Sequence, residues 1–228
     1  MIKQFIKKLI PQSVLKLRYD FLLNRQRRRF GRHCEELLLK VGEILDEEGI
    51  TYWLNYGTLL GAYRDNAFIP HDYDMDLGVY LEDYARIVPL MEKHGLKLKD
   101  HYRFNSWENP ENYAYRFEWK GVYLDFNFYI REGNMVHTYL PLFLPDESYG
   151  PGCHAKVLAE YNEYPFTGVK SMPFLGKMFS VPENTEEFLI ANYGPDYMTP
   201  IKDFDYHDVV KGIVEYSFED KPSYKEIY

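Results

Sequence analysis

Cysteine is scarce in this sequence, which holds only Cys34 and Cys153 among its 228 residues. The two lie far apart and have no partners at the spacing of zinc ligands, so they form neither a zinc site nor a disulfide framework. The sequence also lacks the roughly 18 consecutive apolar residues of a membrane-spanning helix, and it has no internal repeat. These absences leave a globular chain whose length suits one domain, or one domain with an appendage.

Acidic residues are nearly absent from the first 33 positions. Ten Lys or Arg and a single acid, Asp20, give that stretch a charge of +9, whereas the whole chain carries −8. Apolar residues recur there at helical spacing before Pro11, so we expect an amphipathic helix over residues 1–10. A basic arm over residues 1–33 favours peripheral contact with an anionic membrane over docking on the body, and the acidic body argues against nucleic acid. We expect a cytoplasmic protein on the inner face of a bacterial-type membrane.

Residues 34–228 alternate between helical and strand patterns. Helices are expected over residues 34–48, 82–93 and 184–192. Strands are expected over residues 51–54, 77–81, 113–119 and 122–129, with a tight turn at Lys120-Gly121, and residues 96–104 are expected to be rich in strand. Residues 141–182 are expected to be irregular, because prolines and glycines punctuate them.

The most informative stretch is residues 55–83. Asp74 and Asp76 lead into an apolar run at 77–81 that reads as a strand, so their side chains are expected on one face. Two like charges at the edge of a core are costly unless a cation lies between them, and carboxylate oxygens suit Mg²⁺ or Mn²⁺. Asp72, two positions earlier, is either a further ligand or a group that supports the ligands.

A turn of small residues precedes the acids. Gly57 lets backbone N–H groups approach a phosphate closely, Thr58 adds a hydroxyl, and Arg64 is a possible fork for a phosphate. His71 is a further candidate for contact with a donor, although a surface histidine at a strand entrance is the simpler interpretation. A turn that holds a phosphate, a bound cation and a pair of acids are the parts that an enzyme needs to transfer a group at a nucleotide phosphate.

Two charged residues stand out in the second strand-like stretch. Asp125 is a lone acid in an apolar run, and half of the positions of a one-sided strand face water. Arg116 either meets a phosphate or pairs with Glu118. The residues alone leave both questions open.

Other interpretations of the acids fit less well. An EF-hand loop that starts at Asp72 needs Gly at its sixth position and Glu at its twelfth, where this sequence has Leu77 and Asp83. A sugar-nucleotide glycosyltransferase would place a long α/β half before its acids, and about 70 residues precede them here. A salt-bridged structural cluster needs basic partners, and Arg64 is the only one nearby in the sequence.

Together these stretches resemble the LicD family. The resemblance rests on Gly57-Thr58-Leu59-Leu60-Gly61-Ala62 with Arg64, on Phe68-Ile69-Pro70 and on Asp72-Tyr73-Asp74-Met75-Asp76, and it extends more weakly from about Glu35 to about Pro200. Residues 70–83 are most similar to the fukutin-related branch, which has Trp where this chain has His71. The resemblance implies an α+β fold of the nucleotidyltransferase (polymerase-β-like) type over residues 34–228, with a mixed central sheet flanked by helices.

The resemblance also implies an activity. It is the transfer of a phospho-alcohol, such as phosphocholine, ribitol phosphate or glycerol phosphate, from a CDP-linked donor to a hydroxyl of a glycan or glycolipid, with release of CMP, in cell-surface polysaccharide synthesis. The family's third carboxylate lies on a strand after the acidic pair, and Asp125 matches that place, as ligand or base. Two alternatives stay open: nucleotidyl transfer that releases pyrophosphate, and an inactive nucleotide- or glycan-binding module.

The expected site is therefore as follows. The catalytic and metal-binding residues, for Mg²⁺ or Mn²⁺, are Asp74, Asp76 and Asp125, with Asp72 as a possible fourth. The residues expected at the donor phosphates are Gly57, Thr58, Arg64, Arg116 and His71.

Overall fold

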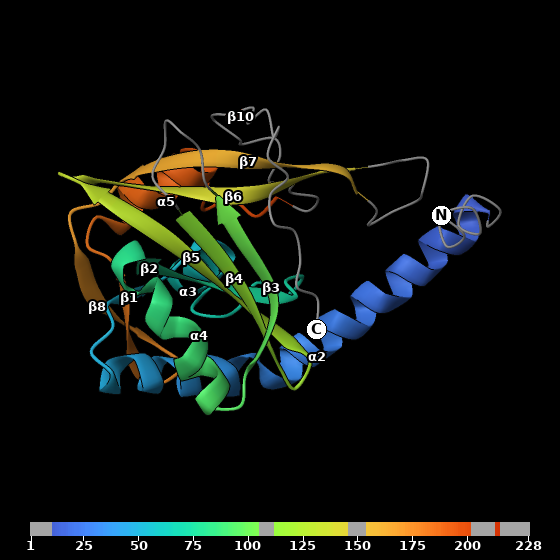
Figure 1. Cartoon of the computed structure of the whole chain (residues 1–228), viewed down its shortest axis with the longest axis horizontal. Helices are drawn as coiled ribbons and strands as arrows, with labels where there is room; N and C mark the ends of the chain where they lie inside the picture. Colours follow the sequence, from blue (N-terminus) through green and yellow to red (C-terminus); the bar gives the residue numbers. More distant parts are fainter. Residues whose placement is uncertain (1–10, 105–111, 146–153, 202–212, 215–228) are drawn as a thin grey trace.

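The computed structural model describes residues 11–104, 112–145, 154–201 and 213–214 (Figure 1). Its helices are α2 (Gln12–Glu47), α3 (Tyr56–Asp65), α4 (Tyr84–Lys93) and α5 (Thr185–Tyr193), with a 3₁₀ turn, η1, at Leu81–Asp83. Its strands are β1 (Tyr52–Leu54), β2 (Asp74–Tyr80), β3 (Lys97–Phe104), β4 (Asn112–Trp119), β5 (Val122–Glu132), β6 (Met135–Pro145), β7 (His154–Pro165), β8 (Val169–Phe174), β9 (Lys177–Pro182) and β10 (Ile213–Val214). This architecture confirms the expected α+β fold with a mixed central sheet flanked by helices.

The central sheet has eight strands in the described part of the chain, and its order places β2 beside β5. β2 and β5 run parallel, whereas the other described pairs of this sheet are antiparallel. The first half of β5 lies between β2 and β4, and its last residues pair with β6. β5 therefore joins the two halves of the sheet, and its beginning lies at the centre of one of them.

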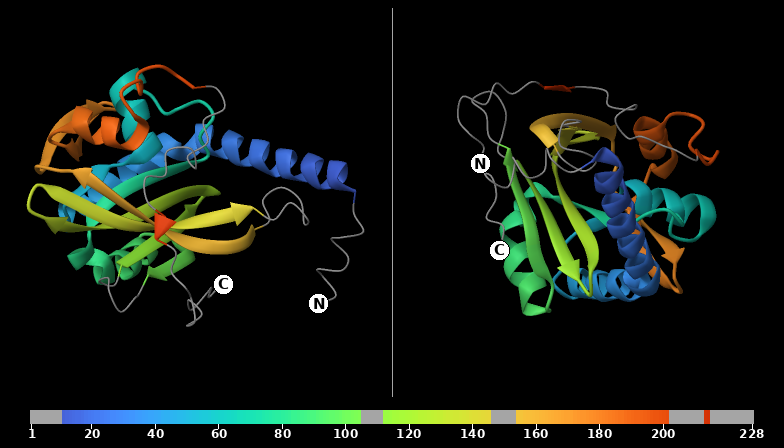
Figure 2. Two further views of the ribbon diagram at one scale, coloured as in Figure 1. Left: turned by 90° about the horizontal axis from the view of Figure 1, so that it is seen from above. Right: turned by 90° about the vertical axis from the view of Figure 1, so that its right-hand side faces the viewer.

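The long helix α2 packs on this sheet with only part of its length. Its buried residues begin at Phe30 and continue through Leu37, Leu38 and Val41 to Leu45. Figure 1 shows its first turns projecting beyond the sheet, and the left view of Figure 2 shows the same projection from above. Among the described helices, none has the length and apolar content that would let it cross a membrane.

Most of the expected elements are confirmed. The helix expected over 34–48 is the last part of α2, so the expected boundary between residues 33 and 34 falls inside a continuous helix. The turn is confirmed as well, because Lys120 and Gly121 have φ of 50° and 77°, the left-handed pair that a two-residue hairpin needs. The helix expected over residues 1–10 lies outside the described residues.

The expectation of irregular structure over residues 141–182 is wrong, because β6 to β9 occupy most of it. The prolines stand where a strand tolerates a missing N–H. Pro145, Pro165 and Pro182 each end a strand, and Pro141 lies beyond the three residues of β6 that pair with β5. These four described prolines therefore mark strand ends and a free edge rather than loops.

Candidate active site

Strand β2 separates apolar from acidic side chains. Met75 and Leu77 are fully buried on one face, and Asp74 and Asp76 lie on the other, half-buried. Residues opposite each other in a parallel pair point to the same side of a sheet, and Asp76 is opposite Asp125 of β5. Asp125 therefore shares a face with the other two acids and is not a strand residue directed away from them.

Arg116 of β4 lies between two of these acids. Its Nε donates to Asp125 at 2.7 Å, and its Nη2 donates to the other oxygen of Asp125 at 2.5 Å and to Asp74 at 3.0 Å. The expected alternative, a pair with Glu118, is wrong, because Glu118 pairs with Lys99 at 2.7 Å. The interpretation that basic partners are nearly absent is also wrong, since Arg116 reaches the acids from a different strand.

The sequence contained the signal for this pairing. A two-residue turn at Lys120-Gly121 places Trp119 opposite Val122, and counting back along both strands then places Arg116 opposite Asp125. The side chains of such a directly opposed pair lie within contact distance. Strand register, rather than proximity in sequence, identifies the partner of Asp125.

Helix α3 supports the backbone of Asp76. The N–H of Asp76 donates to Thr58 Oγ1 at 2.9 Å, and Asn127 Nδ2 is 3.4 Å from the Asp76 carboxylate. Thr58 is 2% exposed. Its hydroxyl oxygen thus ties the first turn of α3 to β2, a role that the sequence did not indicate.

Gly57 makes room for Asp72. A Cβ atom at Gly57 would lie 2.8 Å from Asp72 Oδ2, so any larger residue would displace that carboxylate. Burial raises the pKa of Asp72 to about 6, against the lowering effect of the Arg27 and Arg64 charges. The carboxylate of Asp72 therefore lies against the N-terminus of α3, where the helix dipole favours negative charge.

Burial and mutual repulsion dominate the electrostatics of the acids. Desolvation raises the pKa of Asp74 to about 7, with Arg116 lowering it and the charges of Asp125 and Asp72 raising it. The pKa of Asp76 is raised well above its ordinary value, first by burial and then by the charges of Asp74 and Asp125. One guanidinium is not enough for this cluster, so protons or another cation are favoured there.

A cluster of hydroxyl groups, which sequence reasoning missed, lies behind the acids. Asn55 Nδ2 donates to the Tyr129 hydroxyl at 2.8 Å, Tyr129 donates to Tyr56 at 3.2 Å, and the Tyr56 and Tyr164 hydroxyls are 3.4 Å apart. Burial raises the pKa of Tyr193, and the charges of Asp76 and Asp72 raise it further, so this residue also lies near the acids. The abundance of tyrosine in the sequence was the only signal of this cluster.

Two expected donor residues lie at the margin of the site. Arg64 pairs with Asp65 at 2.7 Å, and its side chain is 10% exposed. His71 is exposed, and its carbonyl accepts a hydrogen bond from Arg27 Nε at 2.9 Å. The charge of Arg64 lowers the pKa of Asp72, so Arg64 lies within electrostatic reach of that carboxylate. His71, in contrast, is held through its backbone.

The carboxylates of Asp74, Asp76 and Asp125 are of the chemical type that binds a divalent cation, but they are not close enough together in this structure to enclose one. Within the described residues, no three His, Cys, Asp or Glu side chains are close enough together to enclose a metal ion. Arg116 occupies the space between Asp74 and Asp125, which accounts for their separation. The donors are nonetheless carboxylates that share one face and have excess negative charge, the set that Mg²⁺ or Mn²⁺ prefers.

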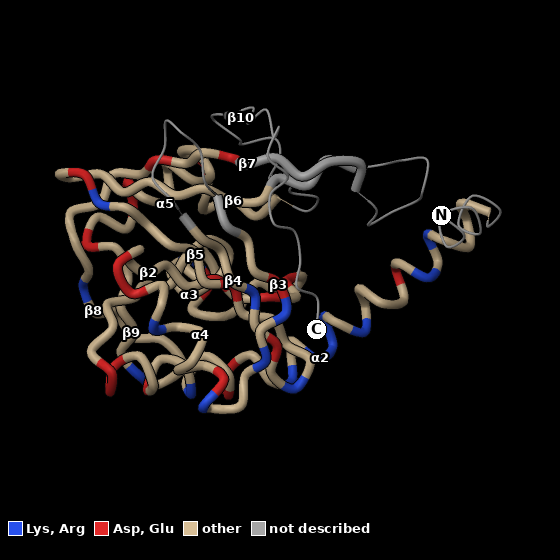
Figure 3. Tube along the Cα trace, in the orientation of Figure 1, with Lys and Arg blue, Asp and Glu red and all other residues tan. Residues whose placement is uncertain are grey.

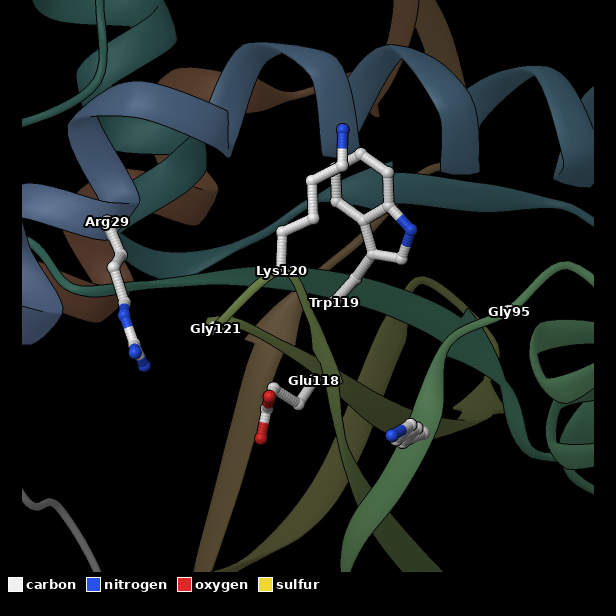
Figure 4. A pocket seen from close by; sticks show the side chains of 7 residues that line it. Arg29, Gly95, Glu118, Trp119, Lys120 and Gly121 are labelled. Carbon is white, nitrogen blue, oxygen red and sulfur yellow. The ribbon is translucent and has the colours of Figure 1, made fainter.

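A hollow of about 380 Å³ lies at the turn between β4 and β5 (Figure 4). It is lined by Arg29, Gly95, Lys97, Glu118, Trp119, Lys120 and Gly121. The guanidinium of Arg29 lies over Gly121, where a Cβ would be 2.7 Å from Arg29 Nη1. Helix α2 is thereby fixed to the same hairpin that carries Arg116 and Asp125.

Comparison with known proteins agrees with the resemblance read from residues 57–76. The domain model described as LicD/FKTN/FKRP, nucleotidyltransferase domain, matches residues 49–184. Human ribitol-5-phosphate transferase FKTN is 28% identical over 179 residues, which cover 78% of this chain and 36% of FKTN. Human ribitol 5-phosphate transferase FKRP is 31% identical over 156 residues, which cover 67% of this chain and 29% of FKRP.

Among solved structures, the lincomycin-bound lincosamide antibiotic adenylyltransferase LnuA matches with a TM-score of 0.40 at 12% identity, covering 64% of this chain and 78% of LnuA. The chain spans about a third of the length of the curated relatives that it matches. The domain match covers more than half of the chain and includes α3, β2 and β5. By that match, the chain belongs to the LicD family.

Proposed function

We propose that this protein transfers a phospho-alcohol from a CDP-linked donor to a hydroxyl of a glycan or glycolipid and releases CMP. The register of β2 and β5 supports this most directly, because it puts Asp76 opposite Asp125 on the face that carries Asp74. Relatives named as ribitol-5-phosphate transferases make CDP-ribitol the first donor to test. Donors that carry choline or glycerol come next.

Mg²⁺ or Mn²⁺ is the proposed cofactor, held by Asp74, Asp76 and Asp125. When bound, the ion would offset negative charge on the donor's pyrophosphate. The raised pKa of Asp74 and of Asp76 reflects a site with too little positive charge, which supports this assignment. Asp72 lies against Gly57 rather than in the strand register, so we propose that it supports the site without binding the ion.

In the proposed reaction, the acceptor oxygen attacks the phosphorus that carries the alcohol. The bond from that phosphorus to the bridging oxygen of CMP breaks, CMP leaves with the bond's electron pair, and the acceptor's proton passes to a carboxylate. Asp125 is the proposed proton acceptor, and Arg116 orients it through two hydrogen bonds. The Nη1 group of Arg116 takes no part in these bonds, so it can donate to a phosphate oxygen.

The groups around α3 would hold the donor's other phosphate. Gly57 and Thr58 lie in the first turn of this helix, whose first N–H groups and dipole favour an anion. The Asp72 carboxylate lies there in this structure, so it would have to move for a donor phosphate to bind. Arg64, which already lies near Asp72, would offset charge on the leaving CMP. The exposed His71 is the weakest of these assignments, and its replacement should change turnover least.

The test is to incubate the full chain with Mg²⁺ and CDP-ribitol, CDP-choline or CDP-glycerol, with and without glycan acceptors, and to measure both CMP and pyrophosphate. Acceptor-dependent release of CMP, lost in Asp125→Asn, supports the proposal. A parallel incubation supplies a nucleoside triphosphate as the donor, and acceptor-dependent release of pyrophosphate there, without CMP release from the CDP-alcohols, would identify a nucleotidyltransferase. Calorimetry in Mg²⁺ adds a second criterion, because tighter binding of UDP than of CDP contradicts the assignment of the donor.

A further inference from the structure

One face of the projecting part of α2 is fixed to the body. Gln26 Nε2 donates to the carbonyl of Gly121 at 2.9 Å, and Arg27 Nε donates to that of His71 at 2.9 Å. The ring of Phe30 meets that of Phe68 edge-on, with centroids 5.4 Å apart. These contacts set the rotation of the helix about its axis, and so they determine which residues point away from the body.

The residues on the opposite face are apolar at the tip and basic behind it. Val14, Leu17 and Phe21 are 52%, 72% and 59% exposed. Four exposed arginines follow on the same side: Arg18, Arg25, Arg28 and Arg32. Val14 and Arg32 are five full turns apart at 3.6 residues per turn, whereas the buried Phe30 is about 160° away from Arg32 around the axis.

The charged residues of the projecting part of α2 are mostly Lys and Arg, as Figure 3 shows along the trace. Arg18, Arg25 and Arg32 form no ion pair with the residues that the structure describes. Beyond residue 34 the exposed positions of α2 are largely acidic, and two of these acids form ion pairs with the body, Glu36 with Lys120 and Glu43 with Lys177. The basic part of the helix therefore has charge left for an external partner.

We infer that this face, residues 14–32 of α2, binds the surface of an anionic lipid bilayer. Apolar side chains that enter the interface, followed by arginines level with lipid phosphates, are the arrangement by which a helix lies on such a membrane. A second copy of the chain is a poor fit, because a parallel symmetric contact would set the arginines of one copy against those of the other, and an antiparallel one would set Arg32 and Arg25 against the apolar Val14 and Phe21. The sequence continues the pattern towards the N-terminus with Lys3, Lys7 and Lys8.

The inference does not depend on the proposed reaction, and it can be tested with the full chain and vesicles alone. Sedimentation with phosphatidylserine–phosphatidylcholine vesicles should recover the protein at 0.15 M salt, and pure phosphatidylcholine vesicles should not. Replacing Arg18, Arg25 and Arg32 with Gln should weaken binding by roughly fivefold per residue. The matched control replaces Lys93, Lys170 and Arg131 with Gln, which removes the same charge from exposed positions of the body.

A second pair of variants tests the apolar part. Leu17→Ser with Phe21→Ser should weaken binding, whereas Met178→Ser with Ile190→Ser should not, although these positions are also exposed. Equal losses of binding in the α2 arginine variant and in its matched control would show that net charge, not this face, governs binding, and would overturn the inference. Unchanged binding of the α2 variants to vesicles would overturn it too. So would sedimentation equilibrium that shows a dimer of the wild-type protein but a monomer of the Leu17→Ser, Phe21→Ser protein.

Circular dichroism should be the same for all variants, since every altered side chain is exposed.

Discussion

Two polar clusters lie close together in this protein, and they differ in how their groups are satisfied. In the hydroxyl cluster, Asn55, Tyr56, Tyr129 and Tyr164 are joined by hydrogen bonds. In the acid cluster, like charges face each other across two strands with one guanidinium between them. A hydrogen-bonded network of neutral groups stabilises a fold, although the buried Asn55 Oδ1 accepts no hydrogen bond from the described residues. A cluster of unbalanced charge costs stability, and such clusters gather at binding and catalytic sites. The first cluster is therefore part of the framework of the fold, and the second is the candidate site.

The largest expected difference is in activity. Replacing Asp74, Asp76 or Asp125 with Asn should lower the kcat of CMP release by several orders of magnitude, because the carboxylates hold the charge that acts on the transition state. Tyr129→Phe should cost less than about tenfold, because its hydroxyl serves packing and hydrogen bonding within the fold. Near-normal turnover in Asp125→Asn would defeat the assignment of this residue.

The next difference is in the response to metal. Mg²⁺ at a hundredfold excess over its Kd should stabilise the folded protein by about 3 kcal/mol, measured as a shift in thermal melting. Asp76→Asn should abolish this gain, and it should leave the metal-free protein as stable as wild type or more so, since repulsion is relieved. Tyr129→Phe should keep the full response to Mg²⁺. A response that survives in Asp76→Asn would place the ion elsewhere.

The clusters should also differ in their dependence on pH. The folded pKa of Asp72 is about 6 and that of Asp74 about 7, both above the ordinary value of 3.8. At these two carboxyls the folded state therefore holds protons that the unfolded state has released, so their contribution to the free energy of unfolding is fully present below pH 3.8 and is lost as the pH rises towards 7.

Since 21% of the Asp74 side chain is exposed, solvent screening reduces the loss to on the order of 2 kcal/mol. Urea titrations of the metal-free protein between pH 4 and 8 measure it. Asp74→Asn should flatten the curve, and a curve that is already flat in wild type would contradict the raised pKa values.

The smallest effect concerns the hydroxyl cluster itself. Tyr129→Phe should lower the free energy of unfolding by about 1 kcal/mol, because the Asn55 amide and the Tyr56 hydroxyl each lose a hydrogen-bond partner. The loss should be the same with and without Mg²⁺. Tyr19→Phe, at a position that is 39% exposed, is the matched control and should change nothing measurable.

Two parts of the acid cluster, the Asp74 and Asp76 pair and the Arg116 and Asp125 pair, could each be anticipated from local pattern, and the hydroxyl cluster could not. Alternation along a strand is enough to put Asp74 and Asp76 on one face, and a two-residue turn fixes which residues of β4 and β5 are opposed. Tyr129 and Tyr164 lie on strands that hold other tyrosines, Tyr123 on β5 and Tyr161 on β7, so nothing local marks their hydroxyls as members of one network. Such a network arises from packing, which depends on the complete fold.

The same distinction explains the other misses. Strands β6 to β9 contain prolines at their ends and edges, and a pattern read without knowledge of the neighbouring strand cannot separate an edge from a loop. The parallel register of β2 and β5 was beyond local reasoning as well. Only the resemblance to a family placed Asp125 with the acidic pair before the structure did.

Register gives the site a property that its sequence motif hides. Asn127 and Asp76 are 51 positions apart, and Arg116 and Asp74 are 42 apart, yet each pair is in contact. A synthetic peptide of residues 55–83 would contain nearly all of the recognisable motif, but neither Arg116 nor the third carboxylate. The motif therefore identifies the site but cannot reproduce it alone. Transfer of the site to another scaffold would require the parallel pair of β2 and β5 together with the hairpin of β4 and β5.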